Sequence, residues 1–111
     1  MKENLTQSQV ENDILVAETN LREPDGRAIR FWERIRTAPC LWTQSQYQSG
    51  SSFWVIAVLG NRCLYFNYLE GGWGWGRFEE WGKISSYHWQ QDEIYHAVFQ
   101  TLFAIDNGGT G

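Results

Sequence analysis

Two apolar runs joined by a two-residue turn constrain this chain more than any other feature. Residues 53–59 read FWVIAVL and residues 62–68 read RCLYFNY, with Gly60-Asn61 between them. Aromatic and β-branched residues on both sides of a tight turn are typical of a β-hairpin. Both faces of this hairpin are mainly apolar, whereas a sheet with one solvated face alternates with polar residues. We therefore expect residues 52–68 to lie centrally in the fold, covered on both sides.

The turn also sets the register that we expect for this hairpin. Side chains alternate between the two faces of a strand, so each cross-strand pair fixes the next one. The pairs expected on one face are Leu59 with Arg62, Ala57 with Leu64, Val55 with Phe66, and Phe53 with Tyr68.

Residues 94–105 carry an apolar stripe at helical spacing. Its members are Ile94, Ala97, Val98, Thr101, Leu102 and Ile105. This spacing places them on one helix face. Asp92 can cap the N-terminus of the helix, and Asn107-Gly108 suits a left-handed stop. The pattern predicts a helix packed on the hairpin, followed by a flexible tail at residues 107–111.

The first twenty residues predict another helix. Thr6-x-x-Gln9 is the first of two overlapping capping-box patterns. Apolar residues then recur at helical spacing, namely Val10, Ile14, Ala17 and Leu21. We expect a helix over residues 7–20, with a strand around residues 14–17 as the alternative.

Residues 27–37, RAIRFWERIRT, fit either regular structure. As a strand, Phe31 and Ile35 share one face; as a helix, Trp32 and Ile35 lie on one face. The Phe, Trp and Ile content favours the strand, and Pro39 is expected to end the element in either case. The arginines of this region favour ion pairing on a solvated face over a site for an acidic protein or RNA.

The length of 111 residues fits one domain. The polar stretch at residues 44–52 is expected to be a loop, too short to join two domains. We expect residues 1–106 to form a single α+β domain with an antiparallel sheet of three to five strands. The C-terminal helix packs on one face of this sheet, and the N-terminal helix covers the other face or an edge.

The most unusual segment is LEGGWGWGRFEEWG, residues 69–82, in which three tryptophans and five glycines share fourteen positions. If it is extended, Trp73, Trp75 and Arg77 share one face and three glycines share the other with Phe78. Glycine weakens a strand interior unless another group approaches its backbone closely. In the structural interpretation, the two tryptophans stack over the sheet and an aromatic side chain, Trp54 or Tyr65, covers the glycines.

In the functional interpretation, this segment binds a partner or ligand. Trp and Arg are enriched in the residues that dominate interface energies, and glutamates supply polar contacts at the edge. The candidate binding residues are Trp73, Trp75, Arg77, Glu79, Glu80 and Trp81. Spacing excludes a phosphate-binding glycine loop, because GxGxxG would require glycine at Arg77 or at Glu79.

Charge and chain composition narrow the choice of partner. The net charge of −4 disfavours nucleic acid and favours a basic protein. The N-terminal residues lack an apolar signal core, and no run approaches the ~20 apolar residues that span a bilayer. We therefore expect a cytoplasmic protein that does not bind membranes and whose two cysteines stay reduced.

Residues suited to catalysis are sparse and poorly spaced. His88 and His96 stand eight positions apart, without the spacing of a metal motif. Cys40, or Glu70 together with either Glu79 or Glu80, would have to support a small hydrolase. We expect no catalytic residue, metal or cofactor. The composition suggests a non-enzymatic protein-binding domain, such as an inhibitor or immunity-type protein that occludes a basic partner. The alternative is a carbohydrate- or small-ligand-binding module with a tryptophan platform.

Overall fold

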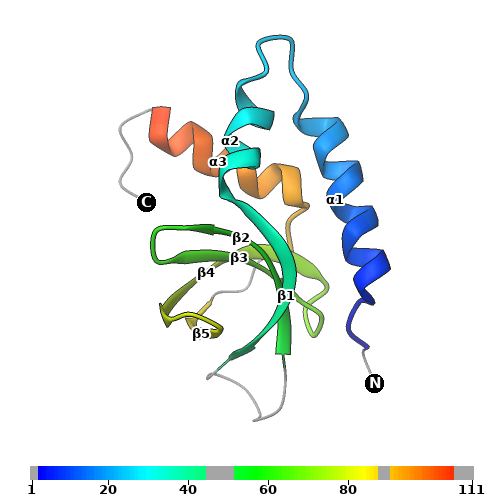
Figure 1. Cartoon of the computed structure of the whole chain (residues 1–111), viewed down its shortest axis with the longest axis vertical. Helices are drawn as coiled ribbons and strands as arrows, with labels where there is room; N and C mark the ends of the chain where they lie inside the picture. Colours follow the sequence, from blue (N-terminus) through cyan, green and yellow to red (C-terminus); the bar gives the residue numbers. More distant parts are fainter. Residues whose placement is uncertain (1–2, 45–51, 88–90, 107–111) are drawn as a thin grey trace.

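The computed structural model describes residues 3–44, 52–87 and 91–106 (Figure 1). Its elements in chain order are α1 (Gln7–Leu21), α2 (Arg27–Ile35), β1 (Arg36–Gln44), β2 (Ser52–Leu59), β3 (Arg62–Asn67), β4 (Gly72–Glu80), β5 (Lys83–Ser86) and α3 (Ile94–Asp106). The helices gather on one side of a strongly curved sheet (Figure 1). This arrangement confirms the α+β fold, with the N-terminal and C-terminal helices packed on a sheet of five strands.

The sheet closes into a barrel. Consecutive strands pair antiparallel, and β5 returns to pair with β1 in parallel through Thr43–Lys83 and Gln44–Ile84. An up-and-down meander with an odd number of strands brings its first and last strands together in parallel. The two register pairs between β1 and β5 join what would otherwise be the two edge strands of the sheet, at which unpaired backbone groups can attract other strands.

The barrel separates two hydrophobic cores, and the hairpin β2–β3 contributes to both. Ile56 and Leu64 pack with the helices in the outer core. Phe53 and Tyr65 belong to the inner core, with their rings stacked at 5.8 Å between centroids. The hairpin is therefore central and covered on both sides, as its two apolar faces predict.

A β-bulge changes the expected register of the hairpin. The pairs Leu59–Arg62 and Ala57–Leu64 are confirmed, but the register shifts between Ala57 and Val55. Beyond the shift, Val55 pairs with Tyr65, and Trp54 pairs with Phe66. The expected pairs of Val55 with Phe66 and of Phe53 with Tyr68 are therefore wrong. An extra residue in one strand bends that strand and increases its twist, which helps a short sheet to close.

Helix α1 begins at the predicted capping box. The Thr6 hydroxyl accepts from the Gln9 N–H at 3.2 Å, and the Gln9 side chain accepts from the Thr6 N–H at 2.8 Å. The four residues of its apolar stripe are all buried. They pack in the same outer core as α3, so of the two positions expected for the N-terminal helix, the opposite face or an edge, the opposite face is wrong. That opposite face is the interior of the barrel.

The prediction of a strand over residues 27–37 is wrong, because this segment forms helix α2 and the start of β1. Four residues at helical spacing, Ala28, Ile29, Trp32 and Ile35, are buried. Their burial against α1, α3 and the barrel outweighs the β-propensity of Phe and Trp. Pro39 does not end the next element: it lies within β1, where the pairing with β2 is irregular between Arg36 and Cys40. Proline is tolerated in strands at such irregularities.

The C-terminal helix α3 is confirmed, and Ile94, Ala97, Val98 and Thr101 are its buried residues. Asp92 lies just before it and pairs through its backbone with Trp73. Most of the predicted 44–52 loop, His88 and the predicted tail at 107–111 lie outside the described residues. In the described part of the chain, no helix is both long and apolar enough to cross a bilayer.

Candidate functional site

The tryptophans at the start of β4 lie under α3. Trp73 is only 3 % exposed, and its ring packs against Phe66 with 5.1 Å between centroids. Trp75 is half-buried, and its indole Nε1 donates to the Ala97 carbonyl of α3 at 3.2 Å. Trp73 is therefore a core residue, and the platform expected from Trp73 and Trp75 is not open to a ligand at that ring.

Two of the three glycines of β4, Gly72 and Gly76, have close neighbours on the other face of the strand. A Cβ atom at Gly76 would lie 3.0 Å from the Ser86 carbonyl oxygen and 3.2 Å from Tyr65 Cε1. A Cβ atom at Gly72 would lie 2.2 Å from the Cα atom of Gln91. Tyr65, one of the two aromatics considered for this place, thus covers Gly76. Because Trp and Gly alternate, β4 places its tryptophans in the outer core on one face and its glycines against the crowded barrel interior on the other.

The rest of the predicted site is exposed at the far end of β4. Arg77, Glu79 and Glu80 are exposed, and Trp81 is the first residue after the strand. Trp81 is 65 % exposed, more than any other described tryptophan. The structure therefore divides the six predicted residues: Trp73 and Trp75 support the fold, and the other four lie at the surface.

Two aromatic side chains hold the exposed indole of Trp81. Its ring centroid lies 5.0 Å from that of Trp42, at an interplanar angle of 58°, and 6.0 Å from that of Phe78. Trp42 is 2 % exposed and belongs to the inner core, so Trp81 packs on a residue of the barrel interior. Support of this kind reduces the rotamer freedom that a side chain would lose on binding.

Two exposed glutamates, Glu79 and Glu80, end β4 directly before Trp81. Glu79 and Glu80 line a hollow of about 250 Å³ together with Lys83 and Ser85. Glu80 and Lys83 are register partners across the β4–β5 turn, and Gly82 has the positive φ of 92° that this turn needs. We refer to Arg77, Glu79, Glu80 and Trp81 as the barrel-end site. It combines an apolar ring with carboxylates that can pair with a cationic group.

The candidate nucleophiles give little support to catalysis. Burial raises the pKa of the Cys63 thiol from its usual 9.0 to about 12, so Cys63 stays a neutral core residue at physiological pH. Cys40 is exposed on β1. His96 is exposed on α3, with its ring 4.3 Å from that of Tyr95. Among the described residues, no three His, Cys, Asp or Glu side chains are grouped to hold a metal ion.

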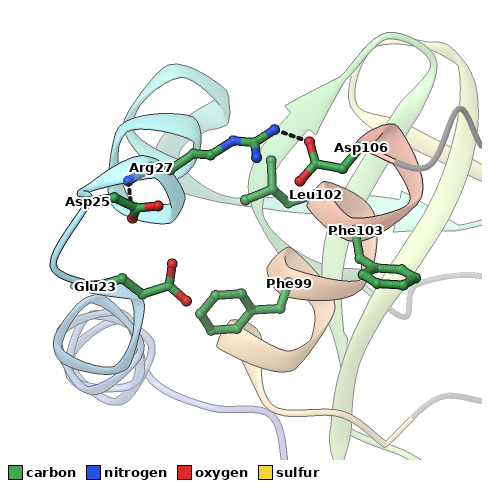
Figure 2. A pocket seen from close by; sticks show the side chains of 7 residues that line it. All are labelled: Glu23, Asp25, Arg27, Phe99, Leu102, Phe103 and Asp106. Atoms are coloured by element: carbon green, nitrogen blue, oxygen red, sulfur yellow. Dashed lines mark hydrogen bonds and ion pairs between the residues drawn. The ribbon is translucent and has the colours of Figure 1, made fainter.

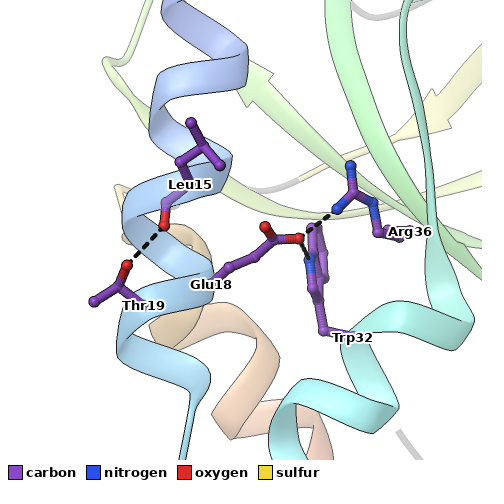
Figure 3. A network of polar contacts seen from close by, with 5 residues as sticks. All are labelled: Leu15, Glu18, Thr19, Trp32 and Arg36. Carbon is purple, nitrogen blue, oxygen red and sulfur yellow. Dashed lines mark hydrogen bonds and ion pairs between the residues drawn. The ribbon is translucent and has the colours of Figure 1, made fainter.

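Two arginines of the arginine-rich region form ion pairs, but with Glu18 and Asp106, which are distant in the sequence, rather than the local pairs that the sequence favours. The Arg36 guanidinium pairs with Glu18 of α1, and the same carboxylate oxygen accepts from the indole Nε1 of Trp32 (Figure 3). Arg27 pairs with Asp106. Sequence reasoning did not identify the Glu18 network, because no local pattern links α1 to α2 and β1.

No protein-family model, curated protein or solved structure matches this chain. Function is therefore inferred from its residues and their geometry.

Proposed function

We propose that this chain is a non-enzymatic, cytoplasmic protein-binding domain that occludes a basic partner, in the manner of an inhibitor or immunity protein. The observation that carries the proposal is the exposed indole of Trp81, which rests on Trp42 and Phe78 and follows the exposed Glu79 and Glu80 at the end of β4. Large aromatic anchors in preformed positions dominate the energies of many protein interfaces.

Charge supports a basic partner over an acidic one. The support comes from the whole chain, which carries a net charge of −4, because at this surface the exposed Glu79 and Glu80 are accompanied by the exposed Arg77 and Lys83. Charge complementarity of this kind speeds association and suppresses wrong partners, whereas buried aromatic contacts slow dissociation. The proposal therefore assigns the rate of encounter to the glutamates and the lifetime of the complex to Trp81.

A carbohydrate ligand is the second candidate. It is supported by the polar hollow of about 250 Å³ that Glu79, Glu80, Lys83 and Ser85 form at the same turn. Sugar rings stack on exposed indole faces, and hydroxyl groups bond to such side chains. The burial of Trp73 removes one ring of the platform on which this candidate depended, so we place it second.

Affinity capture with the full chain tests the first candidate. The wild-type chain, Trp81→Ala and Leu15→Ala are used as baits in parallel in a cytoplasmic extract, with captured proteins quantified by mass spectrometry. Leu15 is a matched control because it is an apolar side chain, 63 % exposed, on α1. We expect a basic protein to be captured by the wild type and Leu15→Ala but depleted from Trp81→Ala.

The glutamates are tested by the charge-removing double variant Glu79→Gln/Glu80→Gln. We expect this variant to capture less of the same protein at low salt, with the difference from wild type shrinking as ionic strength rises. Capture that is unchanged in both Trp81→Ala and the double variant would refute the proposal. Saturable quenching or enhancement of Trp81 fluorescence by an oligosaccharide, without protein capture, would favour the second candidate.

A further inference from the structure

A second hollow lies between the C-terminal turns of α3 and the connection from α1 to α2 (Figure 2). It has a volume of about 270 Å³. Three carboxylates and three apolar side chains contribute to its wall, namely those of Glu23, Asp25, Asp106, Phe99, Leu102 and Phe103. We call this feature the α3 groove. The side formed by α3 is apolar and ends in Asp106, and the side formed by the α1–α2 connection is acidic.

The α3 groove already holds one guanidinium group. Arg27, the first residue of α2, forms an ion pair with Asp106 at the end of α3. Figure 2 shows this guanidinium beside the apolar side chain of Leu102. The backbone N–H of Arg27 donates to Asp25 Oδ1 at 3.1 Å, which fixes the start of α2 next to the groove. The chain itself thus shows how an arginine fits here, with a carboxylate at its N–H groups and an apolar flank.

The other half of the α3 groove has similar components. In Figure 2 the Glu23 carboxylate points toward the ring of Phe99. The ion pairs found in residues 3–44, 52–87 and 91–106 do not include Glu23. A carboxylate beside an aromatic ring can hold a guanidinium through an ion pair and a cation–π contact together.

We propose that the α3 groove binds an arginine side chain from a basic segment of a protein partner. The guanidinium lies between Glu23 and Phe99, and an adjacent apolar side chain of the same segment packs on Phe103. Charge complementarity supports this occupant, since three carboxylates against the single guanidinium of Arg27 leave the groove acidic. Phe103 also lines the groove, and it is 69 % exposed.

Arginine fits this groove better than lysine for a physical reason. The planar guanidinium is weakly hydrated, stacks on aromatic faces and presents several N–H groups in one plane to a carboxylate. The lysine ammonium is a compact, strongly hydrated charge that loses more solvation in such a setting. The inference does not rest on the barrel-end site, because the two features have no lining residue in common.

The test is a two-dimensional amide NMR titration of the full chain with a blocked peptide, acetyl-Gly-Arg-Leu-Gly-amide. Two matched peptides carry Lys or Glu in place of Arg. We expect the Arg peptide to cause saturable shifts in residues 23–27 and 99–106. The Lys peptide should bind about three-fold more weakly or worse, and the Glu peptide should not saturate.

Four variants make the assignment specific. Glu23→Gln and Phe99→Leu should each weaken binding of the Arg peptide about three- to five-fold, as loss of an exposed ion pair or of a cation–π contact predicts. Glu33→Gln removes the same charge from an exposed position of α2 that does not line the groove, and it should bind like wild type. Trp81→Ala should also bind like wild type, which separates this inference from the proposed function.

Three results would overturn the inference. The first is the absence of saturable shifts in residues 23–27 and 99–106. The second is equal binding of the Lys and Arg peptides, which would reduce the groove to an unselective cation site. The third is an affinity of Glu23→Gln equal to that of Glu33→Gln.

Discussion

The indole Nε1 of Trp32 donates a hydrogen bond to the Oε2 atom of Glu18 at 2.9 Å. Trp32 is completely buried, and the same oxygen also accepts from the Arg36 guanidinium (Figure 3). One carboxylate of α1 therefore satisfies the polar atom of the buried indole in α2 and pairs with the first residue of β1. These contacts fix the three elements at the point where the helices meet the barrel.

Removing this carboxylate is expected to destabilise the fold. Glu18→Ala leaves the buried Trp32 N–H without its acceptor, which should lower the free energy of unfolding by about 1–3 kcal/mol. Glu18→Gln keeps an acceptor oxygen and should lose less. Urea unfolding measures both, with Asn12→Ala on the exposed face of α1 as the control. Equal stability of Glu18→Ala and the control would show that the network does not stabilise the fold.

The tryptophans of the 69–82 segment should separate into two classes. Trp73→Ala removes a core side chain and should cost about 3–5 kcal/mol of stability. Trp81→Ala removes a largely exposed ring and its contact with Trp42, which should cost about 1 kcal/mol or less. Thermal and urea unfolding compare the two variants. Similar losses in both would contradict the division into core and surface residues.

Gly72 is expected to tolerate no side chain. The Cβ atom of Gly72→Ala would meet the backbone of Gln91, the residue before Asp92 of the Trp73–Asp92 bridge. Backbone must move to relieve this overlap, so we expect a loss of about 1–3 kcal/mol or more. Gly60→Asn is the control, because Gly60 has a φ of 61° with open space around it and asparagine tolerates that conformation. A Gly72→Ala variant as stable as Gly60→Asn would be inconsistent with this packing.

The buried thiol of Cys63 predicts a pH dependence of stability. Its pKa of about 12 in the fold is higher than the usual 9.0, because burial disfavours the thiolate. The unfolded chain therefore loses the proton first, and the stability due to the neutral thiol is complete below pH 9 and is lost as pH rises toward 12. The stability margin of wild type over Cys63→Ala should be about 1 kcal/mol smaller at pH 10 than at pH 7. A margin that does not change between these two pH values would contradict the shifted pKa.

The two cysteines should also differ in reactivity. Cys40 is exposed and Cys63 is buried. A thiol reagent at pH 8 should label Cys40 rapidly, and label Cys63 only when the chain unfolds. Mass spectrometry of the labelled chain, with Cys40→Ser as the control, counts the modified sites. Rapid labelling of Cys40→Ser in native buffer would show that Cys63 is accessible.

The sequence correctly predicted those elements whose signals lie within a short stretch of neighbouring residues. The capping box at Thr6 and the stripes of α1 and α3 needed no information from distant residues. The hairpin turn at Gly60-Asn61 fixed the first pairs of β2 and β3. Trp32 shows the limit: its β-propensity favoured a strand, but burial against α1 and the barrel selects the helix. The bulge near Val55 and the closure of β5 on β1 depend on the whole sheet and have no local signal.

The candidate site was predictable in part for the same reason. Alternation correctly placed Trp73, Trp75 and Arg77 on one face of β4. Whether that face is open depends on α3, which crosses Trp75 and brings the Ala97 carbonyl to its indole. Trp81 was named from composition alone, and only the fold shows that its ring rests on Trp42. The acidic and aromatic α3 groove joins residues 23–27 with 99–106, which no spacing in the sequence connects.

The most direct test of the central claim is a calorimetric titration of the captured basic partner into wild type, Trp81→Ala and Leu15→Ala. We expect Trp81→Ala to bind the partner at least about ten-fold more weakly than wild type, as for an interface anchor. Leu15→Ala should bind it like wild type. Equal affinity of wild type and Trp81→Ala would contradict the claim that the barrel-end site is the binding surface.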